Sequence, residues 1–179
     1  MLNLWMVAWA LAQAQPEFKP DQSVLPAPAP AGAIRLLDER GNQSFLSMAG
    51  EKTDWPCEEG VMISTPKKNQ NHIVSRQHFK DADIHVEFLL PPKGPANSGV
   101  YIHGNYEIQI LNSSGKEKMT QDDAGALYGF AAPLENACRK PGEWQVFDIR
   151  YRAPRRDEAG KITEKGRVTV WFNGKKVQE

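Results

Sequence analysis

The sequence predicts an all-β fold, and three observations support that prediction. Runs of alternating apolar and polar residues recur along the chain, as expected for strands with one buried face. Turn-forming residues separate these runs, and the 179 residues include 14 glycines and 13 prolines. Beyond the N-terminal apolar segment, no window keeps the period of a helix. Many short strands with frequent turns favour a sandwich or a barrel.

The first 33 residues differ in composition from the rest. Residues 1–14 are apolar and uncharged and end in Ala-Gln-Ala, which is typical of a secretory signal peptide. A buried N-terminal helix is the alternative, since the segment is too short to span a bilayer. Residues 15–33 carry five prolines among alanines and predict an extended linker outside the sheets. We expect an exported protein, periplasmic or extracellular, with no transmembrane anchor and one globular domain over residues 34–179.

The charge balance argues against one class of partner. The chain has 22 basic and 22 acidic residues, so no net charge attracts it to nucleic acid. Its cysteines, Cys57 and Cys138, have neither metal-binding nor redox spacing. In an exported protein they could form a disulfide or stay free, and the sequence does not decide between these alternatives.

The first half of the domain contains several candidate strands. We expect short ones over residues 34–37, 50–55, 61–64 and 73–79, separated by Gly, Asn and Pro. A longer alternating strand covers residues 83–89. On it, Ile84, Val86 and Phe88 share one face, whereas Asp83, His85 and Glu87 share the opposite face.

Residues 97–112 read NSGVYIHGNYEIQILN and predict a strand, a turn at 104–105 and a second strand. On the second strand the side chains of Tyr106, Ile108 and Ile110 point one way, and those of Glu107, Gln109 and Leu111 point the other. If the strand over 83–89 pairs with this hairpin, Glu87 and Glu107 lie on one surface, with Tyr101 and His103 between them.

The second half of the domain also reads as strands and turns. Residues 125–129 predict a turn, residues 144–151 and 168–172 alternate as strands, and Asn173-Gly174 predicts a hairpin turn. The charged run 152–165 predicts a solvated loop.

Several short motifs, taken in order, are similar to those of one known family. They are Phe79, the acidic strand at 81–88, NSGVY at 97–101, YEIQ at 106–109, the Gly-flanked turn at 125–129, GEW at 142–144 and Asn-Gly at 173–174. This order, from about residue 35 to the end, resembles the 3-keto-disaccharide hydrolase domains, also described as 3-keto-glucoside lyase or hydratase domains. The resemblance implies a concanavalin A-like jelly-roll sandwich of two antiparallel sheets, whose concave sheet usually holds sugar. It also implies further C-terminal strands, which we expect to be missing because the chain stops at Glu179.

The resemblance implies cleavage of the glycosidic bond of a 3-keto-glycoside. A ketone at C3 acidifies the proton on C2, so a base that removes this proton can expel the glycosidic oxygen from C1, after which water adds back. Such a site needs a base, a donor for the enolate oxygen and an acid for the leaving group. We expect Glu107 to be the base, Glu87 the second carboxylate, and His103 or Tyr101 the acid or enolate stabiliser.

Two less specialised hypotheses also fit these carboxylates. Both glutamates could pair with Lys or Arg on a solvated sheet face, and two carboxylates on one face would also suit ordinary glycoside hydrolysis. His85, Glu87, His103 and Glu107 offer N and O ligands, so a divalent metal is possible, although exposed strand histidines are commoner than metal ligands. We expect no other cofactor.

The substrate-binding expectations concern residues around Glu107. Asn97 and Ser98 are expected to bind sugar hydroxyls and to shape a loop before Gly99, which would take a positive φ. Tyr101, Gln109 and Tyr128 are expected to contact the sugar. Trp55, Tyr128 and Trp144 could stack on a pyranose or simply pack in the core.

Two functions of different classes therefore follow from the sequence. The first is an exported carbohydrate-active hydrolase or lyase that acts on 3-keto-glycosides. The second is a carbohydrate-binding sandwich, or a truncated homologue, that keeps the fold without turnover. A clustered set of Glu107, Glu87 and His103 in a cleft would favour the enzyme, and a shallow face lined by aromatic residues alone would favour the binding module.

Overall fold

The computed structural model describes residues 20–37, 41–64, 72–94 and 96–179. The expected signal peptide, residues 1–14, lies outside the described residues. The elements are strands, accompanied by one short 3-10 turn at Asn42–Ser44, so the all-β prediction is confirmed for the described part of the chain. Within that part, no helix is long and apolar enough to cross a membrane.

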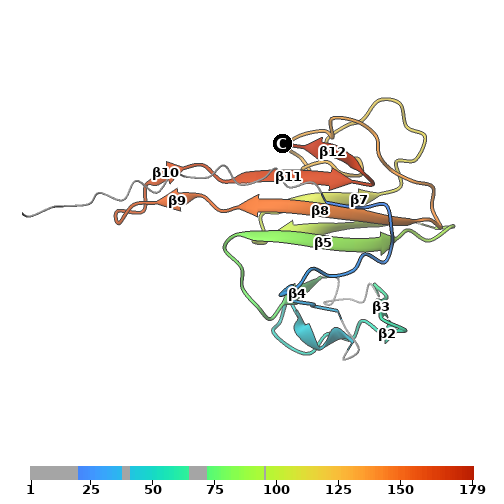
Figure 1. Cartoon of the computed structure of the whole chain (residues 1–179), viewed down its shortest axis with the longest axis horizontal. Helices are drawn as coiled ribbons and strands as arrows, with labels where there is room; N and C mark the ends of the chain where they lie inside the picture. The colour runs from blue at the N-terminus through green and yellow to red at the C-terminus, as the bar shows by residue number, and fades with distance from the viewer. Residues whose placement is uncertain (1–19, 38–40, 65–71, 95) are drawn as a thin grey trace, which may run out of the picture.

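One layer of the fold is a four-stranded antiparallel sheet. Its strands lie in the order β12 (Lys175–Gln178), β11 (Arg167–Phe172), β8 (Trp144–Arg152) and β5 (Ala82–Leu89). Figure 1 shows these strands side by side, with β5 nearest the lower part of the molecule. β11 and β12 form the expected hairpin, in which Asn173 and Gly174 both adopt the positive φ that a tight hairpin turn requires.

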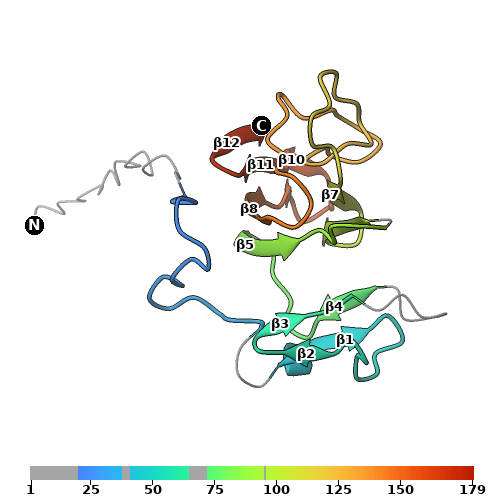
Figure 2. The same cartoon turned by 90° about the vertical axis from the view of Figure 1, so that its right-hand side faces the viewer.

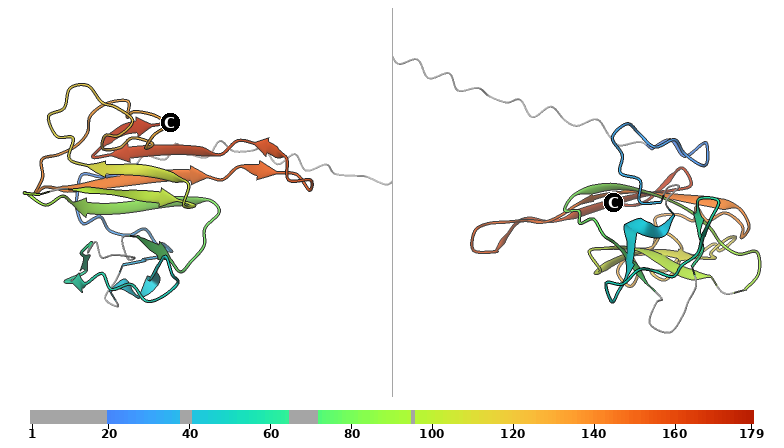
Figure 3. Two further views of the ribbon diagram at one scale, coloured as in Figure 1. Left: turned by 180° about the vertical axis from the view of Figure 1, so that it is seen from behind. Right: turned by 90° about the horizontal axis from the view of Figure 1, so that it is seen from below.

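The second layer is built on the hairpin of β6 (Asn97–Ile102) and β7 (Tyr106–Leu111). A further segment extends this layer, because Leu127 forms a β-bridge with Ile108 on the other edge of β7. Figure 2 and the left view of Figure 3 place this layer against the four-stranded sheet. The fold is therefore the sandwich of antiparallel sheets that was expected.

Apolar side chains from both layers form a single core. They are Ile102, Ile108 and Ile110 from the hairpin and Phe147, Ile149, Val170, Phe172 and Val177 from the four-stranded sheet. Phe147 is fully buried, and its ring lies 4.5 Å from that of Phe172 and 5.1 Å from that of Phe88. Burying one such side chain stabilises the fold by about 1.5–3 kcal/mol. The strand faces that carry these apolar side chains therefore turn inward, and the alternate faces point outward.

The segment before β5 forms a small lobe beside the sandwich (Figure 1). In it β1 (Phe45–Ser47) pairs with β4 (Ile73–Ser75), and β2 (Cys57–Glu58) pairs with β3 (Val61–Met62). The expected strands at 61–64 and 73–79 are therefore present in shorter form, whereas none forms at 34–37 and the 50–55 stretch contributes only a bridge at Lys52. Both cysteines are free thiols.

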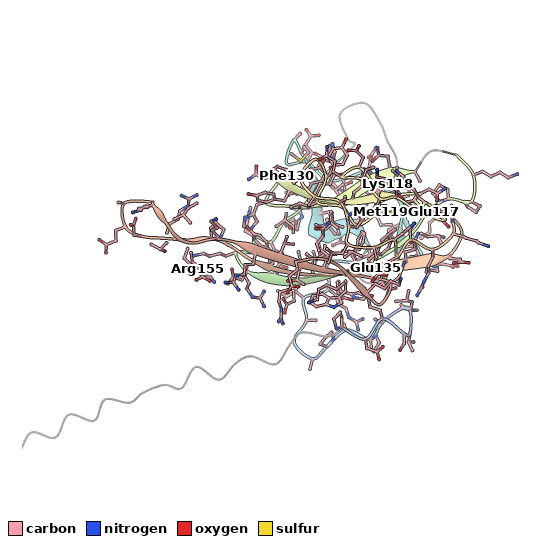
Figure 4. The ribbon with its side chains drawn as sticks, turned by 90° about the horizontal axis from the view of Figure 1, so that it is seen from above. Glu117, Lys118, Met119, Phe130, Glu135 and Arg155 are labelled. Carbon is pink, nitrogen blue, oxygen red and sulfur yellow. The ribbon has the colours of Figure 1, made fainter. Side chains whose placement is uncertain are left out.

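The charged run 152–165 is not the simple loop that was expected. β9 (Arg155–Arg156) pairs with β10 (Ile162–Glu164), and this hairpin continues β8 and β11 beyond the sandwich. Arg155, labelled in Figure 4, lies on this extension, and its guanidinium pairs with Asp81 at 2.6 Å. The charged side chains of residues 152–165 keep this segment out of the core, but its backbone still forms the hydrogen bonds of a strand pair.

The described part of the proline-rich segment contains no strand, but it contacts the domain. Gln22 is buried on the outer face of the four-stranded sheet, where its amide donates to Asp148 Oδ2 at 2.7 Å and to the Trp171 carbonyl at 3.3 Å. The Gly174 N–H donates to the side-chain oxygen Oε1 of Gln22. The right view of Figure 3 shows this segment lying beside the sheet.

Candidate functional site

The two glutamates that were expected on one surface lie on different layers of the sandwich. β5 pairs with β8 along its whole length, and β6 pairs with β7, so β5 does not pair with the β6–β7 hairpin. The expected hairpin pairing is therefore wrong. Glu87 lies on the outer face of the four-stranded sheet, and Glu107 lies on the face of β7 that points away from the core.

Glu87 belongs to a polar cluster that the N-terminal segment covers. Its carboxylate accepts from the Ala27 N–H at 2.5 Å and lies 3.1 Å from His85 Nε2. The other ring nitrogen of His85 lies 2.8 Å from Asp148 Oδ1. The hydrogen bond with Asp148, opposed by burial and assisted by the bond with Glu87, raises the pKa of His85 to about 9. This cluster is an ion-pair network that fastens the segment to the sheet.

Glu107 has a different environment, because it sits between two tyrosines. Tyr101 is its register partner on β6, and the Tyr101 hydroxyl donates to Glu107 Oε2 at 2.7 Å. On the other edge of β7, the Tyr128 N–H donates to the Glu107 carbonyl oxygen at 2.9 Å. Residues directly opposite each other in antiparallel strands project from the same face. Tyr101, Glu107 and Tyr128 therefore form one row on the outward face of this layer.

The phenol beside Glu107 is held in its protonated form. The hydrogen bond to Glu107, burial, and the nearby charges of Glu107 and Tyr128 together raise the pKa of Tyr101 to about 12. At neutral pH Tyr101 is a hydrogen-bond donor to a carboxylate oxygen. The pair can supply a base and a donor at one place on the sheet.

Gly99 leaves the room that the Glu107 side chain occupies. A Cβ at residue 99 would lie 2.5 Å from Glu107 Cγ and 2.7 Å from Cδ, and closer still to Oε1. Gly99 lies within β6 and is not among the residues with positive φ, so the expected loop conformation is wrong. This glycine is needed because a carboxylate lies across its backbone.

Gln109 follows Glu107 on the same face and is almost fully buried, with 2% of its surface exposed. Its amide nitrogen donates to the Asp122 carbonyl at 3.3 Å. Its Oε1 atom is buried and accepts no hydrogen bond from the described residues. Because buried acceptors are normally satisfied, this oxygen is a place for a donor such as a water molecule or a sugar hydroxyl.

The remaining candidates of the sequence analysis are spread over the molecule. Asn97 and Ser98 are exposed and belong to β6 instead of a loop, and the register places Asn97 on the face of Glu107 and Ser98 on the other face. His103 occupies the β6–β7 turn with a φ of 53°, and its Nε2 lies 2.9 Å from the Phe79 carbonyl oxygen. Trp144 lies on the outer face of the four-stranded sheet, on the side of Glu87.

One neighbour of the site was not identified from the sequence. The ring of His72 contacts that of Tyr101 edge-on, with centroids 5.8 Å apart. No motif surrounds His72, and only the docking of the β1–β4 lobe brings it to the hairpin. It adds an imidazole ring beside Tyr101.

Glu107 is half-buried, and the tyrosines on either side of it are exposed. Two hollows of the described surface lie elsewhere, in the lobe, where both are lined by Gln43 and Arg76. Within the described residues no group of three or more His, Cys, Asp or Glu side chains could hold a metal ion. Both ring nitrogens of His85 are already hydrogen bonded, which leaves neither for a metal. The arrangement is a half-buried carboxylate between two exposed tyrosines on the outward face of this layer.

Comparison with known proteins gives one family. Residues 32–179 match the model of the 3-keto-alpha-glucoside-1,2-lyase-like domain. No curated protein matches the chain.

The solved structures similar to the chain include two of putative glycosyl hydrolases from Parabacteroides distasonis ATCC 8503. The structure at 2.13 Å resolution is 35% identical with a TM-score of 0.74, and the match covers 84% of this chain. The structure at 1.70 Å is 16% identical with a TM-score of 0.53 over 77% of this chain, a likeness of fold alone. The chain spans 66% of the length of the first structure and 68% of the second.

Proposed function

Because the chain belongs to the 3-keto-alpha-glucoside-1,2-lyase-like domain family, we propose that it is a carbohydrate-active enzyme that cleaves glycosidic bonds of 3-keto-glycosides. Family membership and the glycosyl hydrolase-like relatives support the broader class. The apolar N-terminal segment that ends in Ala-Gln-Ala supports export to the periplasm or the outside of the cell.

The observation that carries this proposal is the contact between Glu107 and Tyr101. A carboxylate that accepts a 2.7 Å hydrogen bond from a protonated phenol provides a base and an acid side by side. Tyr128 flanks the pair and offers an aromatic face to a sugar ring. Glu87 and His103 have no part in the proposed chemistry, since they contact other groups.

The proposed reaction begins with proton transfer from C2 of the sugar to the Glu107 carboxylate. The electron pair of the broken C2–H bond is first held by the enolate of the C3 ketone. It then forms the C1–C2 double bond as the C1–O bond to the leaving group breaks. The protonated Glu107 gives this proton to the leaving oxygen, and addition of water, with its proton to C2 and its hydroxyl to C1, completes the hydrolysis.

The residues around Glu107 have simple tasks in this scheme. The Tyr101 hydroxyl orients the carboxylate before substrate binds and can donate to the enolate oxygen as negative charge develops there. The buried Gln109 Oε1 accepts a hydrogen bond from a sugar hydroxyl. Asn97 is exposed on the same face and can bind a second hydroxyl.

A carbohydrate-binding module is the second candidate, and one observation favours it. Glu107 is flanked by two exposed tyrosines, 49% exposed at Tyr101 and 45% at Tyr128, and such an aromatic surface also suits binding without turnover. Turnover separates the two candidates. An enzyme releases the leaving group and needs the Glu107 carboxylate to do so, whereas a binding module holds the sugar without releasing anything.

The test is turnover of a chromogenic 3-keto-glucoside by the purified full chain and by Glu107→Gln. Removing the base is expected to lower kcat by at least about 100-fold. Glu117→Gln, in an exposed loop labelled in Figure 4, is the matched control and is expected to keep full activity. A chelator arm asks whether a divalent metal takes part.

The outcomes decide between the candidates. Release of the chromophore that Glu107→Gln abolishes and Glu117→Gln retains supports the enzyme. No release by a folded wild-type protein that still binds the glycoside supports the binding module. Equal activity of both variants would show that Glu107 is not the base.

A further inference from the structure

We propose that the lobe beside the sandwich carries a second binding site, which takes a sugar that bears a carboxylate, such as a uronic acid. The lobe, which holds β1 to β4, lies beside the sandwich in Figure 2. The site consists of two hollows, of about 320 and 470 Å³, that share Gln43 and Arg76 in their linings. The residues that line them do not include Glu107 or its neighbours. The inference therefore goes beyond the proposed function and does not rest on it.

The small sheet of the lobe brings two basic side chains to one hollow. β4 pairs with one edge of β1, and Lys52 bridges to Leu46 on the other edge. Arg76 directly follows β4, and its N–H donates to the Ser44 carbonyl at 2.9 Å. Lys52 and Arg76 thus come from opposite edges of β1, and both line the larger hollow.

The guanidinium of Arg76 is held in place and keeps donors for a ligand. Its Nε donates to the Gln43 carbonyl at 2.8 Å, a bond that does not use the two terminal nitrogens. A guanidinium binds a carboxylate through two parallel hydrogen bonds. The smaller hollow adds a further cation, Arg35.

These positive charges lack an acidic partner in the described part of the chain. Among the described residues, no carboxylate forms an ion pair with Arg35, Lys52 or Arg76. Three cations that line shared hollows without a carboxylate among them attract an anion.

The rest of the lining suits a sugar better than a bare anion. The amides of Gln43 and Gln77 and the hydroxyl of Ser44 can donate to and accept from sugar hydroxyls. Ile34 is 58% exposed and offers an apolar surface to the C–H groups of a sugar ring. The hollow volumes fall within the range of small-molecule sites, roughly 300–1,000 Å³. Cations, hydroxyl-binding groups and an apolar side chain together match a sugar acid.

A matched pair of ligands tests the site by calorimetry at low salt. Methyl β-D-glucuronide and methyl β-D-glucoside differ only at C6, where the first carries the carboxylate, and inorganic phosphate serves as the bare anion. The full chain is expected to bind the glucuronide at least about 10-fold more tightly than the glucoside or phosphate. The Kd for the glucuronide should rise at least about 10-fold in Arg76→Gln and about 3-fold in Lys52→Gln. Arg167→Gln removes an exposed arginine outside the hollows and should leave Kd unchanged.

The Lys52 variant keeps the test decisive if Arg76→Gln disturbs the lobe, because only the backbone of Lys52 contributes to the bridge with Leu46. The proposal would be overturned by no binding of the glucuronide, by equal affinity for the glucoside, or by equal affinity for phosphate, which would show an anion site without sugar selectivity. An unchanged Kd in Lys52→Gln together with a folded, unaffected Arg76→Gln would also overturn it. Neither glycoside carries a 3-keto group, so the result is independent of turnover at Glu107.

Discussion

Tyr101 and Glu107 face each other across the β6–β7 hairpin, and the phenol donates a 2.7 Å hydrogen bond to the carboxylate. The two residues reach this contact because they are register partners and their side chains leave the same face. The pair lies on a hairpin whose opposite face is anchored by Ile102, Ile108 and Ile110, so a packed core supports its geometry.

Tyr101→Phe is expected to lower kcat/KM for a 3-keto-glucoside by about 100-fold while leaving the fold intact. The substitution removes one hydroxyl that orients Glu107 and can stabilise the enolate. Steady-state kinetics measure the effect, and Tyr151→Phe, which alters a tyrosine of the core face, is the control expected to keep activity. Unchanged kcat/KM in Tyr101→Phe would remove this hydroxyl from the mechanism.

Gly99→Ala is expected to impair turnover through displacement of Glu107. The added Cβ would overlap the Glu107 side chain, which must rotate away and lose its hydrogen bond with Tyr101. The backbone of Gly99 is in an ordinary strand conformation that alanine also adopts. The free energy of unfolding should therefore change by less than about 1 kcal/mol. Kinetics together with urea unfolding check both statements, and Ser98→Ala, on the opposite face, serves as the control. A fully active Gly99→Ala would show that the position of the carboxylate is unimportant.

The sequence predicted the hairpin because its pattern is local. Alternation over residues 106–111 assigned Ile108 and Ile110 to the core and Glu107 to the outward face, and the structure confirms both. The contact with Tyr101 needed more than this alternation, because the loop holds three residues, 103–105, and its length sets the register that places Tyr101 opposite Glu107.

The pairing of β5 could not be predicted in this way. Strands that follow each other in the chain usually pair, so Glu87 was expected on one surface with Glu107, but β5 pairs with β8, which begins more than fifty residues further on. Alternation gives the faces of a strand without identifying its neighbour. The role of Gly99 was missed for a related reason, because the need for space arises only when Glu107 lies across it.

His85 is expected to make stability depend on pH in the alkaline range. Its pKa rises from an ordinary value of 6.5 to about 9 in the folded protein, first because of the hydrogen bond with Asp148. A raised folded-state pKa stabilises the protein fully below about pH 6.5, and this contribution disappears as pH rises through about 9. The urea midpoint of the wild type should therefore fall between these values more steeply than that of His85→Gln.

The control for this experiment is His78→Gln, which removes an exposed histidine outside the cluster and should keep the wild-type pH dependence. The effect extends to the N-terminal segment, because Gln22 and Ala27 donate to the same carboxylates that His85 contacts. Identical pH profiles for the wild type and His85→Gln would mean that the His85 ion pairs contribute nothing measurable.

Asp123 is expected to be the most sensitive single position in the loop that follows β7. Its buried carboxylate accepts hydrogen bonds from Ser113 Oγ at 2.9 Å, Lys116 Nζ at 2.7 Å and the Thr120 N–H at 2.7 Å. Burial alone would raise its pKa, but the bonds from Lys116, Thr120 and Ser113 hold the pKa at about 2. The stabilisation is present above about pH 4 and is lost as pH falls toward 2.

Asp123→Asn leaves these donors facing a neutral amide, so it should lower the free energy of unfolding by about 2–3 kcal/mol near neutral pH. The neighbouring Asp122→Asn is the matched control, because the Asp122 side chain is exposed and its contacts to Gln109 and Thr120 come from its backbone carbonyl and N–H. The loss should also affect ligand binding, since the same loop continues to Gly125, whose N–H donates to the Gln109 carbonyl oxygen, and then to Tyr128 beside Glu107. Equal stability of the two variants in urea unfolding would contradict the assignment of this network as the anchor of the loop.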